Sequence, residues 1–428
     1  MLYVEQPVGT GFSYGKEPPN DEEGVSSDFY GFLLNFYRTF PEHRAKRLYI
    51  VGESYAGYYV PSIAHYIYNK NKKQKETINL AGIGLGNGWA DVNIQTPVVI
   101  DYAWWHGMID SVTRDALHVE WEHCSLQTGS EPSPFHPLTT PDECGIMGAT
   151  LTAAGAGLFS WGAPNTYDVT TFDPYLLLTS HNSTNYHFFN NARVQKALNV
   201  PKDIGKPWMG CIPGEGRRRR QLAKKVPDDG VFATIRRALT EKLLLDDDRP
   251  VSVVPYIAEL LDEAGIQVLV YNGDRDLSTC AQGSETLLDR MKWSGSADWA
   301  NPNVYRRGLW MVDGQVAGRA KSLKRLDFVV VFNSGHLVPY NQPINALDLI
   351  TRLLKAESFI DVDIPVVYHA PKRVKKHTLS HSTKLSVIAV VIAAICGFFL
   401  GIVSVFVYSS FQRSKYDRIG DVEIEPQG

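Results

Sequence analysis

The sequence lacks the features that define several common classes of protein. It has five cysteines in 428 residues, too few for a scaffold built on disulfides. Its formal net charge is −3, so no excess of basic residues points to a nucleic-acid partner. The first five residues lack the basic start and long apolar core of a secretory signal peptide. We therefore expect a globular protein, and we predict no metal, no cofactor and no nucleic-acid partner.

Charge is also absent from a long stretch near the C-terminus. Residues 385–411 carry no charged side chain over 27 positions, enough to cross a bilayer. The flank before this stretch is more basic than the flank after it, and the positive-inside rule would therefore place the folded part in the cytoplasm. A long folded domain is translocated largely regardless of charge, however. We expect a transmembrane helix here, with the folded part luminal and a cytoplasmic tail at 412–428.

The most informative stretch is residues 52–57, which read Gly-Glu-Ser-Tyr-Ala-Gly. The mostly apolar run 47–51 before it is typical of a strand. After it, four apolar residues recur at the spacing of one helix face: Val60, Ile63, Ala64 and Ile67. A strand, a tight turn with serine at its tip and a helix form a nucleophile elbow, which usually reads G-x-S-x-G. Because Ala56 and Gly57 keep the turn small, we predict Ser54 as a nucleophile rather than an ordinary turn serine.

Strands and helices alternate along much of the chain. Further strands are predicted at 2–4, 80–85, 266–270 and 328–332, and helices at 254–263 and about 346–354. A helix is also predicted before residues 52–57, with Ser27 or Asp28 as its cap and Pro41 at its end. The apolar residues on one side of it are Phe29, Phe32, Leu33, Phe36 and Phe40. This alternation predicts an α/β protein with a mostly parallel sheet.

The alternation fades between residues 102 and 249, where Trp, Pro and Gly are frequent. We interpret this region as a largely helical cap inserted over the active-site face. A run of four arginines at 217–220 within it is either a solvated loop or a site of proteolytic processing. The predicted organisation begins with a first core part at 1–101, the cap at 102–249 and a second core part at 250–360. A basic linker at 361–384, the transmembrane helix at 385–411 and the tail at 412–428 follow.

Three residues with catalytic chemistry fall just past the ends of predicted strands, where catalytic groups gather in open α/β sheets. They are Ser54, Asp276 and His336, and their order along the chain is that of the α/β-hydrolase fold. In this arrangement the histidine takes the serine proton, while the aspartate orients and stabilises the imidazolium. Asp274 is the rival carboxylate.

Five segments together resemble the serine carboxypeptidase family, peptidase family S10. Residues 52–57 resemble its elbow. Residues 4–14 resemble its segment D-Q-P…G-F-S-Y, and residues 84–91 resemble G-I-G-N-G…D. Residues 271–276 resemble Y-N-G-D-x-D, and residues 335–343 resemble G-H-M-V-P…Q-P. The match runs from residue 2 to about 354 in the family's order. The combination with residues 385–411 resembles membrane-anchored fungal late-Golgi carboxypeptidases.

This resemblance implies an α/β-hydrolase fold and the removal of single residues from peptide C-termini through an acyl-enzyme. It implies that Asp276 rather than Asp274 is catalytic, together with His336. Glu53 matches a position that helps bind the substrate's free carboxylate, in keeping with the family's preference for acidic pH. Tyr55 would give one backbone N–H to the oxyanion hole.

One departure from the family concerns its N-G-G-P-G-C-S-S segment, which supplies a second oxyanion donor and precedes the D-Q-P segment. We do not find it, and we expect an N-terminally truncated sequence that retains the triad but has little or no activity. Two alternatives stay open: an acyltransferase on the same scaffold, and a catalytically dead membrane-anchored homologue. The expected location is the secretory or endomembrane system (Golgi, vacuole or a lysosome-like organelle), with the catalytic part in the lumen.

The cysteines and one sequon add weaker expectations. Cys124 and Cys144 both lie in the cap and are our first choice for a disulfide. By resemblance, Cys211 matches a cysteine whose partner lies in the absent segment, and Cys280 matches a free cysteine near the catalytic aspartate. Asn182 begins the sequon Asn-Ser-Thr and is the predicted glycosylation site.

Overall fold

The structure is a computed structural model that describes residues 1–15, 18–19, 21–127, 150, 153–154, 164–172, 184–202, 207–208 and 252–365. The chain divides into two compact units, Met1–Val366 and Val367–Gly428. The second unit lies outside the described residues, so the architecture below is that of the first.

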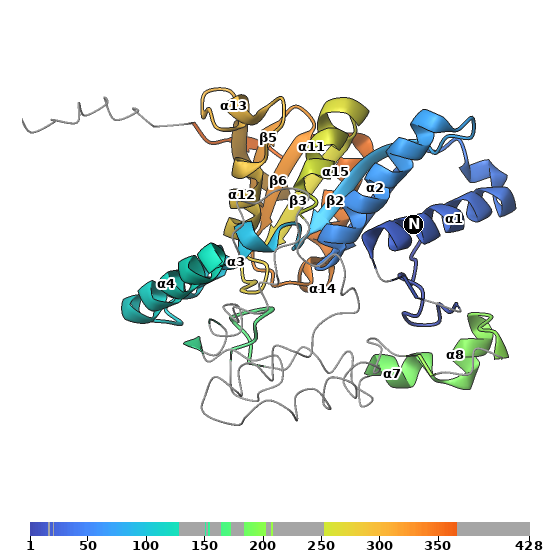
Figure 1. Cartoon of the computed structure of the whole chain (residues 1–428), viewed down its shortest axis with the longest axis horizontal. Helices are drawn as coiled ribbons and strands as arrows, with labels where there is room; N and C mark the ends of the chain where they lie inside the picture. The colour runs from blue at the N-terminus through green and yellow to red at the C-terminus, as the bar shows by residue number, and fades with distance from the viewer. Residues whose placement is uncertain are drawn as a thin grey trace, which may run out of the picture. The chain divides into compact units, whose positions relative to one another are not determined.

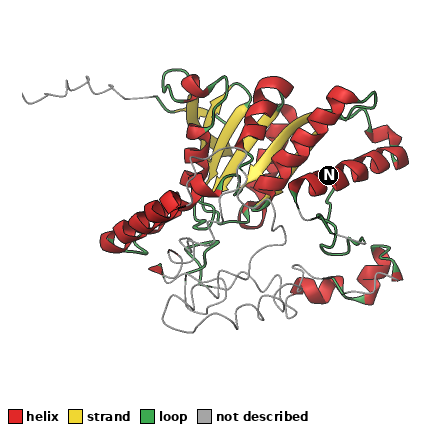
Figure 2. Cartoon of the chain, in the orientation of Figure 1, coloured by secondary structure: helices red, strands yellow, loops and turns green. Residues whose placement is uncertain are grey.

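The first unit is built on a seven-stranded sheet in the order β1-β2-β3-β6-β5-β4-β7 (Figures 1 and 2). The strands are β1 (Leu48–Glu53), β2 (Leu80–Gly86), β3 (Gln267–Gly273), β4 (Arg306–Val312), β5 (Gln315–Leu323), β6 (Leu326–Val331) and β7 (Val362–Asp363). Neighbours among β1, β2, β3 and β6 pair in parallel, whereas every pairing of β5, β4 and β7 is antiparallel. The predicted mostly parallel sheet is therefore a mixed sheet.

Helices cover both faces of this sheet because its central strands are apolar on both sides. In β3, Val268 and Val270 contact the larger core beneath α2 and α11, and the alternating Leu269 and Tyr271 contact a second core beneath α15. A parallel strand buried on both faces shows this continuous apolar run. The helices are α1 (Glu22–Thr39), α2 (Ala56–Lys73), α3 (Val92–Trp105), α4 (Ser111–Gln127), α7 (Thr184–Phe189), α8 (Ala192–Ala197), α11 (Val254–Glu259), α12 (Ala281–Arg290), α13 (Ser296–Trp299), α14 (Val338–Asn341) and α15 (Pro343–Lys355), with a short 3₁₀ helix η1 (Pro41–His43) and a short π-helix η4 (Leu260–Ala264).

The first helix, α1, begins earlier than the sequence predicted. Its cap is Asp21, whose side chain accepts a hydrogen bond of 2.6 Å from the Gly24 N–H. The predicted caps, Ser27 and Asp28, lie inside the helix. An acidic N-cap followed by two glutamates in the first turn suits the positive end of the helix dipole, which explains the earlier start.

The buried face of α1 also differs from the prediction. The side chains that it buries include Val25, Tyr30, Leu33 and Tyr37. Phe32 and Phe40, predicted to face the core, are 36% and 45% exposed. A tyrosine can replace phenylalanine in the seam with α2 because its hydroxyl finds a partner there: Tyr30 donates to Gln74 at 2.7 Å.

Two further differences concern strands. β4 and β5 form a hairpin that the sequence analysis did not predict, joined by Asp313 and Gly314 at φ of 49° and 74°. Asp-Gly is the dipeptide that two-residue hairpin turns favour, so the signal was present. Residues 2–4, predicted as a strand, are in no strand, and Tyr3 is 85% exposed. Among the described strands, β1 pairs only with β2, so no neighbour holds residues 2–4 in the sheet.

Several predictions fall on residues that the structure does not describe. These are Asn182, Cys144, Cys211, the arginines at 217–220 and the apolar stretch 385–411, together with the side chain of Cys124. Much of the predicted cap lies there too, and the predicted domain boundaries stay predictions. Within the described ranges, no helix combines the length and the hydropathy needed to cross a bilayer.

Candidate active site

Ser54 occupies the sharp turn between β1 and α2. Its φ is 64°, a left-handed conformation that costs a serine about 1–2 kcal/mol. The turn is held by the backbone: the Ser54 N–H donates to Gly86 O at 2.9 Å, and the Ser54 carbonyl accepts from Gly57 and Trp89 N–H groups at 2.9 and 3.1 Å. Strain that the surrounding hydrogen bonds maintain is typical of a functional position.

The small residues around this turn are required by close contacts. A Cβ on Gly57 would lie 2.2 Å from Trp89 O, and one on Gly52 would lie 2.5 Å from the Cβ of Ala56. The turn thus brings α2 directly against the segment that follows β2. This explains why Gly57 can complete the elbow although the usual glycine position holds Ala56.

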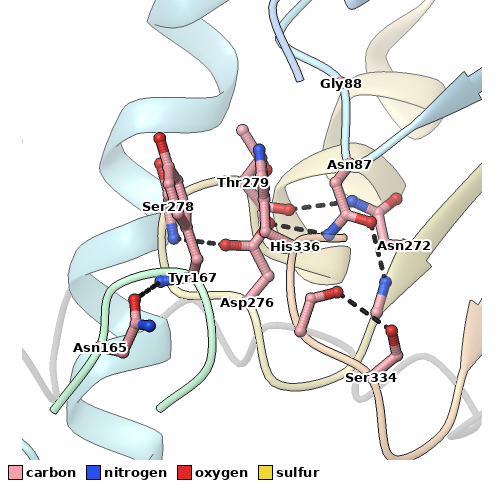
Figure 3. Close-up of polar contacts among 12 residues, drawn as sticks. Asn87, Gly88, Asn165, Tyr167, Asn272, Asp276, Ser278, Thr279, Ser334 and His336 are labelled. Carbon is pink, nitrogen blue, oxygen red and sulfur yellow. Dashed lines mark hydrogen bonds and ion pairs between the residues drawn. The ribbon is translucent and has the colours of Figure 1, made fainter. Parts of the chain in front are cut away.

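Asp276 and His336 form a buried pair at the same edge of the sheet (Figure 3). The His336 Nδ1 lies 2.7 Å from Asp276 Oδ2, and the two side chains are 3% and 0% exposed. With Asp276 as a carboxylate, Nδ1 carries the proton and Nε2 is left to act as a base. That Nε2 is buried without a hydrogen-bond partner in the described part of the chain.

Three other donors hold the Asp276 carboxylate (Figure 3). Asn87 Nδ2 donates to Oδ2 at 2.8 Å, and the Thr279 hydroxyl donates to the same oxygen at 2.6 Å. The Ser278 N–H donates to Oδ1 at 2.9 Å. Four donors, counting His336, therefore surround this buried carboxylate, as a buried charged group requires.

His336 is fixed from a second direction by the segment that contains Tyr167. The two rings stack at 4.3 Å between centroids and 13° between planes, and the His336 N–H donates to Tyr167 O at 2.7 Å. A Cβ on Gly335 would lie 2.2 Å from that same carbonyl, so only glycine permits this approach. The imidazole is held by an aspartate on one side and an aromatic ring on its face.

The rival carboxylate, Asp274, has a different role. Its Oδ1 accepts from the Ser334 N–H at 3.1 Å, and its backbone carbonyl accepts from the Tyr102 hydroxyl at 2.8 Å. These contacts tie the loop after β3 to the loop after β6. The carboxylate that contacts His336 is Asp276.

Glu53, the last residue of β1, is half-buried beside the pair. Burial raises its pKa to about 7, against the lowering effects of His336 and of a hydrogen bond from the Val338 N–H, while Asp276 raises it further. Its Oε2 has no hydrogen-bond partner in the described ranges. Below pH 7 this carboxyl group is mostly protonated, and it can then donate a hydrogen bond to another carboxylate.

Tyr55 is the N-cap of α2, so its backbone lies at the positive end of that helix. Its ring lies 5.2 Å from Tyr58 and 4.9 Å from Tyr59 between centroids. The aromatic cluster fixes the first turn of the helix directly after Ser54. The part of Tyr55 in an oxyanion hole stays a prediction.

Cys280 is a buried free cysteine near Asp276. Burial raises the pKa of its thiol to about 12, with smaller raising and lowering effects from Asp276 and nearby backbone N–H groups. A thiol with this pKa is protonated at neutral pH and is a poor nucleophile. Within the described residues, no group of three or more His, Cys, Asp or Glu side chains is placed to hold a metal ion.

Sequence reasoning missed Asn87, Thr279 and Tyr167 as parts of the site. Asn87 follows β2 as Ser54 follows β1, so its position at a strand end was a usable signal. For Thr279 the signal was weaker: this residue lies only three positions after Asp276 in the chain. No sequence pattern places Tyr167 against His336, since the two are joined only by the fold.

The comparisons with known proteins now identify the family. A family model described as serine carboxypeptidase matches residues 1–356, and the chain belongs to that family. It is 29% identical over 389 residues to the pheromone-processing carboxypeptidase kex1 of Aspergillus terreus, covering 87% of this chain and 55% of that protein. It is 31% identical over 379 residues to serine carboxypeptidase-like 49 of Arabidopsis thaliana, covering 86% and 64%.

A solved structure supports the α/β-hydrolase-like fold. The prohormone-processing carboxypeptidase Kex1(Δ)p of Saccharomyces cerevisiae matches with a TM-score of 0.63 and 24% identity, over 83% of this chain and 73% of that one. The chain spans about half to two-thirds of the length of the curated relatives named above. The family and the fold are thereby established.

Proposed function

We propose that the chain carries the catalytic machinery of a serine carboxypeptidase, which hydrolyses the C-terminal peptide bond of peptides or proteins. One observation carries this proposal. The left-handed Ser54 lies at the same sheet edge as a buried Asp276–His336 pair whose Nε2 is unpartnered in the described residues. β1, β2, β3 and β6 are parallel neighbours, so the residues that follow them gather at one edge.

The reaction uses the pair twice. In the first step Ser54 Oγ attacks the carbonyl carbon, and His336 Nε2 takes the hydroxyl proton. The imidazolium, stabilised by Asp276, then gives that proton to the leaving amine, and an ester to Ser54 remains. A water molecule attacks the ester while His336 takes its proton, and the serine recovers a proton as the acid product leaves.

Glu53 explains why a free C-terminus is the proposed substrate. An ionised carboxylate in the substrate repels a second ionised carboxylate nearby, unless a proton is shared between them. Because the pKa of Glu53 is raised to about 7, the group supplies that proton at acidic pH. An ester or an amide terminus carries no negative charge, so it gains less from that proton and is not repelled when Glu53 ionises.

The test measures release of the C-terminal amino acid from an N-blocked dipeptide. We expect the rate of release by the purified chain, however low, to fall by about 10⁴- to 10⁶-fold in Ser54→Ala. A phosphonofluoridate should label Ser54, as read by mass spectrometry, in the unaltered chain alone. Release that is equal in the two proteins would reject the proposal.

We further propose that the enzyme is a single-pass glycoprotein of the endomembrane system with its catalytic part in the lumen. The support is the uncharged stretch 385–411 and the sequon at Asn182. In sealed microsomes the catalytic part should resist added protease, and the protein should lose mass on deglycosylation. Cleavage of the catalytic part in intact vesicles would contradict this location.

A further inference from the structure

Asn87 and Thr279 are two buried polar side chains that contact the catalytic pair but take no part in the proton transfers above. Both donate to Asp276 Oδ2, at 2.8 and 2.6 Å, the oxygen that also accepts from His336. The inference below rests on the proposed function of this pair. It concerns what the two extra donors do to His336.

The orientation of the Asn87 amide is fixed by its other contacts. Its Oδ1 accepts from the Gly273 N–H at 3.1 Å, and its own N–H donates to Tyr271 O at 2.8 Å. The amide oxygen is therefore turned toward β3, and the NH₂ group must face Asp276. Asn87 acts on the carboxylate only as a donor.

Thr279 contacts both members of the pair (Figure 3). Its hydroxyl has one proton, and the 2.6 Å distance to Asp276 Oδ2 assigns that proton to the carboxylate. The hydroxyl oxygen then lies 3.1 Å from His336 Nδ1, where it could accept from the imidazolium and act in the opposite sense. This contact is long beside the 2.7 Å between Nδ1 and Asp276 Oδ2 and the 2.6 Å of the hydroxyl's own donation, so the donor effect on the carboxylate is the larger one. Thr279 is 1% exposed, so water does not replace these contacts.

We propose that Asn87 and Thr279 are positioning residues that weaken the hold of Asp276 on the Nδ1 proton of His336, and so keep His336 available as a base at lower pH. Each donor draws negative charge from Oδ2, which lowers the attraction that this oxygen exerts on the imidazolium. Removing either donor should make His336 harder to deprotonate.

Other titratable and charged groups around the pair also act on the pKa of His336, so the experiment must separate their effects from those of Asn87 and Thr279. Burial lowers the pKa of His336, but the charge and hydrogen bond of Asp276 and the charge of Glu53 raise it overall. Tyr102 and Cys280, on the side of Asp276, have raised pKa values and stay neutral in the relevant range. On the remaining sides, the stacked ring is that of Tyr167, and the nearby carboxylates are Asp168 and Asp274. Because the charge of Glu53 raises the pKa of His336 and the pKa of Glu53 is itself raised to about 7, the test is made in a Glu53→Gln background.

The experiment replaces Thr279 with valine, which keeps the shape and removes the hydroxyl, and with serine, which keeps the hydroxyl. The pKa of His336 is measured by NMR on histidine-labelled protein, and the acid limb of kcat/KM is measured in parallel. We expect Thr279→Val to raise both by about 0.5 to 1 pH unit, and Thr279→Ser to change them little. Thr96→Val is the matched control, because Thr96 is a buried threonine of α3 and, among the described residues, the hydrogen-bond partners of Asp276 and His336 do not include it.

A second variant guards against a folding defect in the first. Asn87→Gly removes the amide while keeping the positive φ of 40°, and we expect the same upward shift. A folded variant in which the pKa of His336 is unchanged or lower overturns the inference. Because NMR does not depend on turnover, the titration decides it even if the unaltered chain hydrolyses no peptide, which would count against the proposed function alone.

Discussion

The ends of β1 and β3 each place a carboxyl group at the catalytic edge, and the surroundings of the two groups differ. Asp276, after β3, is fully buried and accepts hydrogen bonds from four donors. Glu53, at the end of β1, is half-buried, and its Oε2 has no partner in the described part of the chain. Burial raises the pKa of Glu53 to about 7.

This difference divides two tasks between two chemically similar residues. A carboxylate ringed by donors holds the imidazole in one orientation while the histidine gains and loses a proton. A carboxyl group whose pKa burial raises to about 7 is protonated at acidic pH and can share its proton with a ligand. The environment assigns the task, as in other sites that contain two carboxyl groups.

The largest effect is expected from Asp276→Asn, which removes the carboxyl group that follows β3. The amide would present an NH₂ group to donors, and the imidazole would lose its orienting partner. We expect kcat to fall by about 10⁴-fold, measured as release of the C-terminal residue. Asp274→Asn is the matched control, because an amide oxygen also accepts from the Ser334 N–H, and we expect less than a tenfold loss. A severe Asp274→Asn and a mild Asp276→Asn would reverse the assignment.

The next effect concerns the turn that carries Glu53 and Ser54. Gly57→Ala would force a Cβ to within 2.2 Å of Trp89 O, so the backbone must move. We expect a loss of about 2–4 kcal/mol in the free energy of unfolding, measured by denaturant titration. Gly31→Ala in α1 is the control, since its Cβ would meet nothing within 4 Å, and it should stabilise by a few tenths to 1 kcal/mol. Equal effects in the two variants would show that the close contact is not needed.

The sequence predicted this region well because strand ends in an α/β sheet meet at one edge. Ser54, Asp276 and His336 each follow an apolar run, and the structure places them after β1, β3 and β6. Asn87 and Thr279 escaped prediction because their importance depends on which strands are neighbours. The pairing of β2 with β3, 180 residues apart in the chain, is what brings Asn87 to Asp276.

The failures elsewhere have local physical reasons. On α1, Tyr30, whose hydroxyl donates to Gln74, and Tyr37 are buried, whereas Phe32 and Phe40 are exposed although hydrophobicity alone favoured their burial. The sequence analysis predicts no hairpin at β4–β5, although Asp313-Gly314 marks its turn. Periodicity identified single elements reliably, whereas the choice of face and of antiparallel pairing depended on contacts distant in the chain.

The Glu53→Gln variant removes the other carboxyl group of the comparison, the one at the end of β1. An amide resembles the neutral acid in shape, but it neither titrates nor shares a proton between two oxygens. We expect the preference for a peptide acid over its C-terminal amide to fall by about 10- to 100-fold, with kcat for an ester substrate nearly unchanged. The measurement compares kcat/KM for the acid and the amide of one peptide. A preference equal to that of the unaltered chain would remove Glu53 from substrate recognition.

The smallest effect is the pH dependence of substrate binding. Below pH 7 Glu53 is protonated and donates to the substrate carboxylate, whereas above pH 7 it ionises and the two negative charges repel. We therefore expect KM for a peptide acid to rise several-fold as the pH passes from about 6 to 8, while KM for the matching ester or amide stays level. Asp276→Asn, assayed at its residual rate, should keep this rise, because the group that titrates lies on β1. In Glu53→Gln the rise should disappear, and a rise that persists there would place the titrating group on the substrate side of the site rather than at the end of β1.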